Sequence, residues 1–372
     1  YRLGSYIESS SMTHISLDAW ASRVGTTRSG AMEEYIETLT RGVPYMVNIL
    51  GGCMYGLDDL ARGELLFYKG NLKPAENFLK QAFSKAEARN QYEVRNRALF
   101  YLLRIGLAQG NFQSVQGVLK DLEAQLKMND YHVRFITYDL VAGWYYSVLG
   151  QSHLVADWLK GKYAQESFAI FKANFRSIIR AKFEYVNKHY HELLPFLEGQ
   201  KGTLSSLLFA KLGRKTLEAV CHYHLKNKAA SLSALKEAYD LAESNNLTMP
   251  FIELGKDMRT LASTAIGERD CGIPLQWLEM IKRKAATYAK RLAFVIAEYK
   301  KANNLEEDAQ LSPREMDVLH DLSHGLSRPE IAANHGLSIN TVKMVLNAIY
   351  TKLDADNVAD VIRIALDRKL IK

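Results

Sequence analysis

The sequence is poor in proline and cysteine, and each scarcity limits the architectures it can adopt. Only seven prolines occur in 372 residues, and none falls between Pro74 and Pro195. Because proline inside a helix removes a backbone hydrogen bond, this long stretch can form uninterrupted helices. The cysteines are odd in number and far apart, which favours buried free thiols in a reducing cytosol over disulfides or a zinc site: Cys53, Cys221 and Cys271.

Targeting and membrane signals are also missing. The sequence has no charged-then-apolar leader and no run of about 18 apolar residues. We therefore expect a cytoplasmic protein with no membrane partner. The chain begins at Tyr1 rather than at a methionine, so we expect it to be the later part of a longer product or a shortened form of one.

The reactive side chains form no catalytic or metal-binding pattern. No Ser/His/Asp order, glycosidase-like carboxylate pair or H-E-x-x-H motif has a supporting context. Two His-x-His triplets occur, at 189–191 and 222–224. On a helix, the two imidazoles of such a triplet point apart, so they do not easily share one ion. We expect no catalytic residue, no metal and no cofactor, and a protein that is not an enzyme.

The net charge of +7 would favour nucleic acid if it lay in the right place. Residues 311–372 contain eight Lys or Arg and eight Asp or Glu, which sum to zero. The surplus lies upstream, above all in 275–301, where seven basic residues accompany two glutamates. The overall charge is therefore weak support for DNA binding, and such a function has to rest on a motif.

What the chain does contain is helical periodicity and a long repeat. Apolar residues recur at helical spacing, without alternating β-branched runs. Gly70, Gly110 and Gly150 lie 40 residues apart, each between two apolar segments. Glycine suits a tight turn between helices because it tolerates a positive φ just after the last helical residue. Weaker units without the glycine follow around Lys188 and Lys226.

The segments after these turns share small and apolar residues at helical spacing, which indicates a buried side: Ala75, Leu79, Ala82, Val115, Leu119, Leu122, Val155, Leu159, Leu235, Ala238 and Leu241. The pattern resembles the tetratricopeptide repeat, although the period is longer and most signature aromatic and proline positions are absent. The resemblance implies an all-α solenoid with a concave face for a small polar inducer or a partner protein. Ordinary packing is the simpler explanation for any single one of the implied groove positions: Glu64, Tyr68, Arg97, Arg104, Trp144, Lys182, Tyr185 and Tyr223.

The predicted organisation has four parts. Residues 1–55 contain helical pieces at 31–40 and 44–50, and residues 56–262 form the repeat domain. Residues 263–310 contain a long basic helix at 275–301 and a polar linker at 302–310, before a small domain at 311–372. The apolar side of the long helix is expected to consist of Trp277, Ile281, Tyr288, Leu292 and Ile296.

The small domain contains three helix starts with good capping chemistry. Ser312 with Glu315, and Ser327 with Glu330, have the spacing of capping boxes. Ser338 caps a third helix. Because each cap stabilises its helix by roughly 1 kcal/mol, we interpret the two glutamates as structural residues rather than catalytic acids.

The third of these helices, at 339–353, is expected to have one buried and one open face. Its apolar residues recur at spacings of four, three and four, and are expected to pack toward Ile331, Ala332 and Leu337: Val342, Leu346, Ile349 and Leu353. Its outer face would then carry Asn340, Lys343, Met344, Asn347 and Thr351. Helix, glycine turn and a helix with an exposed polar face together predict a helix-turn-helix, whose second helix lies in the major groove of DNA.

This segment resembles the LuxR/GerE family of regulators over about 60 residues. The matching motifs are L-S-P-R-E, G-L-S-R-P-E-I-A, L-S-I-N-T-V-K and I-Y-T-K-L. The resemblance implies a four-helix domain that binds double-stranded promoter DNA and self-associates on it. It implies base contacts from Lys343, Met344 and Asn347, phosphate contacts from Arg328, Ser338, Asn340, Thr341 and Lys352, and dimer contacts in the last helix from Val358, Val361, Ile362 and Ala365.

The segment departs from the family pattern in ways that reduce its charge. Val345 stands where a histidine is usual, Pro329 replaces a polar residue and Asp354 replaces a turn glycine, while Met344 and Asn347 are uncharged. With few phosphate contacts, one copy should bind DNA weakly and with a shallow salt dependence. Dimerisation or further copies would then be needed for useful occupancy.

The stretch at 241–261, L-A-E-S-N-N-L-T-M-P-F-I-E-L-G-K-D-M-R-T-L, resembles the end of the repeat region in the MalT-like, large LuxR-type bacterial regulators. In those proteins a nucleotide-binding ATPase module precedes the repeats. The phosphate-binding motif G-x-x-x-x-G-K-[ST] does not occur in this sequence. Such a module therefore lies upstream of Tyr1, or this regulator lacks one.

Two functions are consistent with these patterns. The first is a cytoplasmic bacterial transcription regulator, in which an inducer or partner protein binds the repeat domain and controls promoter binding. RNA polymerase is a further candidate partner of such a regulator. The alternative is a repeat scaffold for partner proteins whose helix-turn-helix has drifted from DNA binding, which the zero net charge of 311–372 and Val345 favour.

Overall fold

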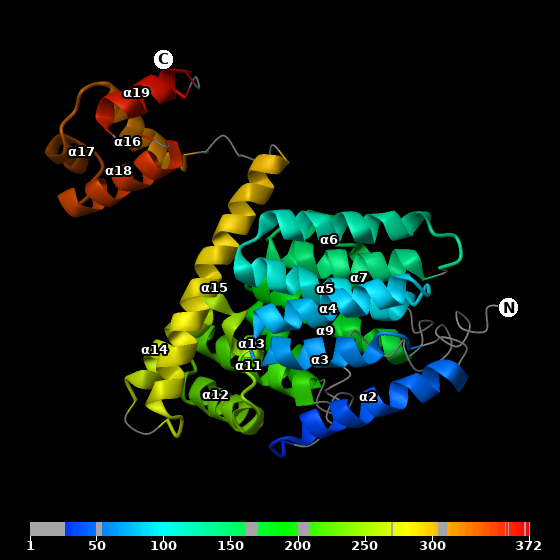
Figure 1. The fold of residues 1–372 in the computed structure, drawn as a ribbon. Coiled ribbons are helices and arrows are strands. Elements are labelled where there is room, and N and C mark those ends of the chain that lie inside the picture. The colour runs from blue at the N-terminus through cyan, green and yellow to red at the C-terminus, as the bar shows by residue number, and fades with distance from the viewer. Residues whose placement is uncertain are drawn as a thin grey trace. The chain divides into compact units, whose positions relative to one another are not determined.

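The computed structural model describes residues 27–49, 54–131, 133–160, 170–199, 208–268, 271–303, 311–353, 355, 357–367 and 370–371, with the side chains of 170–176 excepted. Every element within these ranges is helical, as the sequence predicts (Figure 1). The chain divides into two compact units, residues 1–297 and 298–372. Cys53, Asp354 and most of the predicted linker lie outside the described residues. None of the helices in the described part is long and apolar enough to cross a membrane.

The larger unit consists of helices that pack mainly against their neighbours in sequence (Figure 1). Its helices are α2 (Ala31–Ile49), α3 (Leu57–Tyr68), α4 (Leu72–Glu87), α5 (Tyr92–Gln109), α6 (Phe112–Ala124), η2 (Gln125–Lys127), α7 (Arg134–Val148), η3 (Ser152–Leu154), α8 (Asp157–Lys160), α9 (Ile170–Val186), α10 (Tyr190–Gly199), α11 (Leu208–His224), α12 (Lys228–Ala242), η4 (Glu243–Asn245), α13 (Met249–Ile252), α14 (Gly255–Ile266) and α15 (Leu275–Ala302).

The repeating turn predicted from the glycines is confirmed, and it recurs at both glycine-free positions. Gly70, Gly110, Gly150, Lys188 and Lys226 all have a positive φ, between 62° and 81°. In each turn the next amide donates to the carbonyl five residues back, at 2.8–2.9 Å. This is the Schellman arrangement that closes a helix C-terminus. The same backbone geometry therefore ends α3, α5, α7, α9 and α11, although the specific likeness to tetratricopeptide repeats stays a prediction.

The helix at the start of the larger unit differs from the prediction. The helix α2 runs through Pro44 instead of stopping there. Proline removes one helical hydrogen bond, but the burial of Leu39 and Val43 holds the segment in one helix. After Gly150 the described residues form η3 and α8, and Val155 and Leu159 are buried as expected.

The predicted buried stripe of the repeats is confirmed at nearly every position. Ala75, Leu79, Ala82, Val115, Leu122, Leu235 and Ala238 are all fully buried. Leu119 and Leu241 are only half-buried, and Val118 and Ala242 beside them are buried instead. A shift of one residue rotates a helix face by about 100°. The sequence pattern therefore predicted where these two helices lie, but it predicted their buried faces one residue away from the observed ones.

The long helix α15 is present as predicted and lies against the turns of two helix pairs. Arg291 donates from Nη1 to the carbonyl oxygen of Ala108, at 3.1 Å. The Nζ atom of Lys284 would lie 4.0 Å from a Cβ placed on Gly70. These two α15 residues are seven apart, which on a helix is about 10 Å. That distance matches the usual separation of packed helices.

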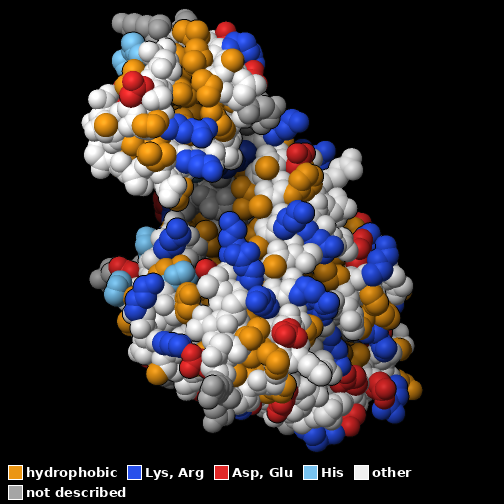
Figure 2. Space-filling model, turned by 90° about the vertical axis from the view of Figure 1, so that its left-hand side faces the viewer, with side chains coloured by type: hydrophobic (Ala, Val, Ile, Leu, Met, Phe, Trp, Pro, Cys, Tyr) orange, Lys and Arg blue, Asp and Glu red, His pale blue; other side chains and the backbone are white. Residues whose placement is uncertain are grey.

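The buried side of α15 differs in part from the prediction. Ile281 and Tyr288 are buried, whereas Trp277, Leu292 and Ile296 are half-buried. The remaining buried positions are Leu278, Ala285, Val295 and Tyr299. In Figure 2, basic side chains are spread over the face of the larger unit that is turned toward the viewer.

The smaller unit contains α16 (Pro313–Ser323), α17 (Arg328–Asn334), α18 (Ile339–Leu353) and α19 (Val358–Asp367). One core joins all four helices, and it contains the predicted inner face of α18: Val342, Leu346, Ile349 and Leu353. A polar contact also connects the first two helices. Asn334 Nδ2 donates to Asp321 Oδ2 at 3.2 Å, and His335 Nε2 lies 2.9 Å from the same oxygen.

Replacing Gly110 by alanine is expected to lower the free energy of unfolding by about 1–2 kcal/mol, the cost of a left-handed conformation for an L residue. The added Cβ would also lie 3.1 Å from Cβ of Arg291. Gly117→Ala is the matched control, because Gly117 lies exposed inside α6 with no atom near its added Cβ. It should raise the free energy of unfolding by about 0.5–1 kcal/mol. Urea unfolding followed by circular dichroism tests both, and changes of the same sign would contradict the turn geometry.

Candidate nucleic-acid interface and ligand cavity

The first helix of the small unit begins with the predicted capping box. The Ser312 amide donates to Glu315 Oε2 at 2.6 Å, and the Glu315 amide donates to Ser312 Oγ at 3.2 Å. Ser327 donates from both its amide and its hydroxyl to Glu330 Oε2, at 2.7 and 2.6 Å. Both glutamates therefore hold helix starts, which agrees with their predicted structural role.

The outer face of α18 is open along its length. Asn340, Lys343, Met344 and Asn347 are all exposed, and Met344 is 72% exposed. The opposite side of the helix is fully buried in the domain core. Because that core fixes the rotation of α18, these four side chains are held outward together. A single rigid face of this kind can enter a DNA groove.

The first turn of α18 is fixed by two of the predicted phosphate-contacting residues. Ser338 Oγ accepts from the Thr341 amide at 3.0 Å and lies 2.8 Å from the Thr341 hydroxyl. Both hydroxyls are therefore engaged with each other at the start of the helix. The backbone N–H groups of this turn point toward the helix N-terminus, where they can hold a phosphate.

The two predicted cationic phosphate contacts differ in their surroundings. Arg328 is exposed at the start of α17. Lys352 donates from Nζ to Glu315 Oε2 at 2.5 Å. A phosphate contact by Lys352 would therefore compete with the carboxylate that also caps α16.

A comparison of sequences finds matches for this part of the chain. Residues 309–365 match the family described as bacterial regulatory proteins, luxR family. The C-terminal unit contains a LuxR-type helix-turn-helix domain. The transcriptional activator protein YukR of Yersinia ruckeri is 42% identical over 62 residues, which are 17% of this chain and 27% of YukR. The match to YukR thus spans about a quarter of its length.

The last helix of the LuxR-type domain contributes to the core as well as to the surface. Val361 and Ala365 are fully buried within the domain. Val358 is 39% exposed and Ile362 is half-buried. Of the four residues predicted to make dimer contacts, only Val358 and Ile362 are thus available, and the exposed Leu366 extends the same strip.

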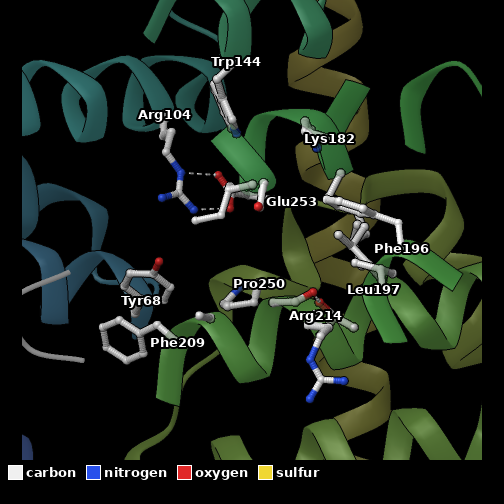
Figure 3. A pocket seen from close by; sticks show the side chains of 18 of the residues that line it. Tyr68, Arg104, Trp144, Lys182, Phe196, Leu197, Phe209, Arg214, Pro250 and Glu253 are labelled. Carbon is white, nitrogen blue, oxygen red and sulfur yellow. Dashed lines mark hydrogen bonds and ion pairs between the residues drawn. The ribbon is translucent and has the colours of Figure 1, made fainter. Parts of the chain in front are cut away.

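The larger unit contains a cavity of about 170 Å³ inside the helical stack (Figure 3). Four of the eight predicted groove residues line it: Tyr68, Arg104, Trp144 and Lys182. A cavity of this size compares with one of about 150 Å³ that binds benzene in another protein. It can therefore hold a small organic molecule.

The other four predicted groove residues do not line the cavity. Glu64 and Arg97 are buried in the packing of α3 and α5. Tyr185 donates its hydroxyl hydrogen to Asp257 Oδ2 at 2.6 Å, and Tyr223 stands edge-on to the ring of His224. These four residues lie on the predicted helices, but their positions along the helix or the directions of their side chains place them away from the cavity.

A buried ion pair forms one wall of the cavity. Arg104 donates from Nε and Nη2 to the two carboxylate oxygens of Glu253, at 3.0 and 2.6 Å. Both side chains are only 10% exposed. Burial alone would lower the pKa of Arg104, but the Glu253 carboxylate outweighs it and the pKa is raised. The guanidinium also lies 4.5–5.7 Å from five aromatic ring centroids.

Lys182 is another cation of the cavity, and among the described residues it has no ion pair. Its Nζ lies 5.9 Å from the ring centroid of Trp144 and 5.2 Å from that of Tyr185. No acceptor hydrogen-bonds to it in the described part of the chain. Burial lowers the pKa of Lys182, and Glu253 only partly opposes that effect.

Sequence reasoning missed several residues on the far side of the cavity. Phe196, Phe209, Arg214, Pro250 and Glu253 come from α10, α11 and the segment around α13 (Figure 3). Only Pro250 and Glu253 lie in a stretch that the sequence singled out, as part of 241–261. The groove was predicted from first helices of repeats alone, so Phe196 on the second helix α10 and the residues of the closing segment carried no signal. Phe209 and Arg214 lie on the first helix α11, where the sequence pattern selected Tyr223 instead.

Glu315→Gln is expected to destabilise α16 by roughly 1 kcal/mol at neutral pH, the usual effect of a lost cap. Burial alone would raise the pKa of Glu315, but Lys352 and Ser312 lower it below the ordinary 4.5. The stabilisation is therefore present above that value and is lost as the pH falls through the lowered pKa. Hydrogen exchange of peptides covering α16 should show a difference at pH 7 that vanishes in acid. Asp317→Asn, on the exposed side of α16, is the control, and an equal effect there would contradict the assignment.

Arg104→Met should destabilise the larger unit by about 3–5 kcal/mol, because it leaves Glu253 buried without its partner. Replacing both residues by methionine should recover most of that loss, since a buried ion pair contributes little net stability against apolar residues. Urea unfolding of the parent, the two single variants and the double variant measures the coupling. Additive single effects would show that the two side chains do not act as a pair.

Proposed function

We propose that this protein is a bacterial transcription regulator that binds double-stranded promoter DNA through α18. The exposed polar face of α18, held outward by a buried opposite face, supports this proposal. On such a helix, lysine can bond to guanine, asparagine to adenine, and methionine can contact the methyl group of thymine. We assign base contacts to Lys343, Met344 and Asn347.

The phosphate contacts would come from the helix starts that flank this face. Arg328 is exposed, and Ser338, Asn340 and Thr341 lie at the N-terminus of α18, where backbone N–H groups favour an anion. Lys352 would have to leave Glu315 to contribute. Because residues 311–372 have no net charge, one copy should bind weakly. Self-association through Val358, Ile362 and Leu366 would supply a second copy.

The larger unit is proposed to control that binding. A ligand or a partner protein in the helical repeat would change self-association or DNA affinity, and RNA polymerase would be the downstream partner. The cavity lined by Tyr68, Arg104, Trp144 and Lys182 supports a small-molecule input. YukR is described as a transcriptional activator, which is in keeping with such a role for a LuxR-type domain.

A second candidate function is a scaffold for partner proteins in which the helix-turn-helix no longer binds DNA. Two observations favour it: the domain has no net charge, and Lys352 is already paired with Glu315. The two functions differ in salt dependence. A regulator should shift genomic DNA fragments at low salt and lose them as salt rises. A scaffold should show no shift at any salt concentration.

Lys343→Ala and Asn347→Ala are each expected to weaken binding to the selected promoter fragment by about 1–3 kcal/mol, because each removes a base contact. Both side chains are exposed, so the domain should stay folded. Fragments selected from genomic DNA by the parent protein, followed by electrophoretic titration of the variants, make the test. Arg363→Ala on α19 is the control, since Arg363 is an exposed cation paired within its own helix. Unchanged affinity in both α18 variants would refute the groove assignment.

A further inference from the structure

Among the described residues around the cavity, one of the three cations has no ion pair. Arg104 is held by Glu253, and Arg214 is held by Glu218. In the described part of the chain, Lys182 makes no hydrogen bond or ion pair, and its ammonium lies near the rings of Trp144 and Tyr185. The side chain is half-buried, and an ammonium that loses part of its hydration without gaining a hydrogen bond is unfavourable. A ligand with a negative charge would supply the missing partner.

The rest of the lining is mainly aromatic and apolar. Tyr68 and Phe209 stack with ring centroids 3.8 Å apart. Phe196 stands on the side of Lys182, and Trp144 lies between Lys182 and Arg104 (Figure 3). Aromatic walls of this kind bind flat or apolar bodies, with a few polar groups to orient them.

We propose that this cavity binds a small organic acid, with its carboxylate on Lys182 and its apolar or aromatic body between Trp144, Phe196 and Phe209. The inference rests on the proposed ligand control of the repeat domain and gives that ligand a chemical class. One unpaired cation matches one carboxylate. A phosphate would ordinarily need a bidentate arginine or several donors, and the paired donors of Arg104 and Arg214 are turned to their own glutamates. A sugar would need more polar partners than this lining offers.

The experiment uses the full chain and two acids with their neutral amides. Benzoate, phenylacetate, benzamide and phenylacetamide are titrated into the protein by calorimetry. A charge-assisted hydrogen bond should make each acid bind about ten- to a hundredfold more tightly than its amide. Amides that bind as well as the acids, or no binding by either acid, would overturn the proposed ligand class.

Variants of Lys182 test the contact itself. Lys182→Met should remove the preference for acids over amides, and Lys182→Arg should keep it. Lys182→Met should also unfold at no lower urea concentration than the parent, since it removes a half-buried charge that has no ion pair in the described part of the chain. Lys120→Met is the matched control, because Lys120 is exposed on α6 and outside the lining. A preference that survives in Lys182→Met would refute the contact.

The same titration separates this proposal from the proposed control of DNA binding, because it needs no DNA. Acids that bind through Lys182 but leave DNA affinity unchanged would uphold the ligand class and overturn the control. Protein that binds DNA normally but shows no preference for acids would overturn the ligand class and leave DNA binding in place.

Discussion

The closing segment of the larger unit meets α5 at the ion pair between Arg104 and Glu253, and the cavity lies beside that pair. The pair joins α5 to the segment after α13, across 149 residues of sequence. An unpaired charge at either position would be strongly unfavourable in so buried a place, so the two segments must meet. The same closing segment also ends α3: the Thr248 amide donates to the Tyr68 carbonyl at 2.8 Å, and its hydroxyl donates to the Lys69 carbonyl at 3.1 Å. The cavity lies beside the place where this segment meets α3 and α5.

Sequence predicted the parts of the fold that depend on local chemistry. The turns were found because a positive φ after a helix favours glycine, and because the period pointed to Lys188 and Lys226 where glycine was missing. The LuxR-type domain was found because its caps and its core stripe are local patterns. The continuous helix through Pro44 was missed, because tertiary burial there outweighs a local preference.

The cavity was only half predictable, for a physical reason. Helical periodicity identifies a face, so Arg97 and Arg104 fall together, seven residues apart on α5. It does not say at which depth along that face a space opens, and only Arg104 lies at the cavity. Its partner Glu253 comes from a segment without the repeat, and no local pattern pairs two residues so distant in sequence. The open face of α18 was predictable because a single small core determines its rotation.

The contacts of α15 limit how the larger unit can deform. A helix does not stretch, so Lys284 and Arg291 stay about 10 Å apart along its axis. Arg291 packs against the turn at Gly110, and the Lys284 ammonium lies near the turn at Gly70, which belongs to a different helix pair. While both interactions persist, the distance between these two helix pairs can change little. The helix α15 therefore limits how far the pairs can move relative to each other. A change in the curvature of the stack would displace this helix along its length, and its last residues already belong to the C-terminal unit.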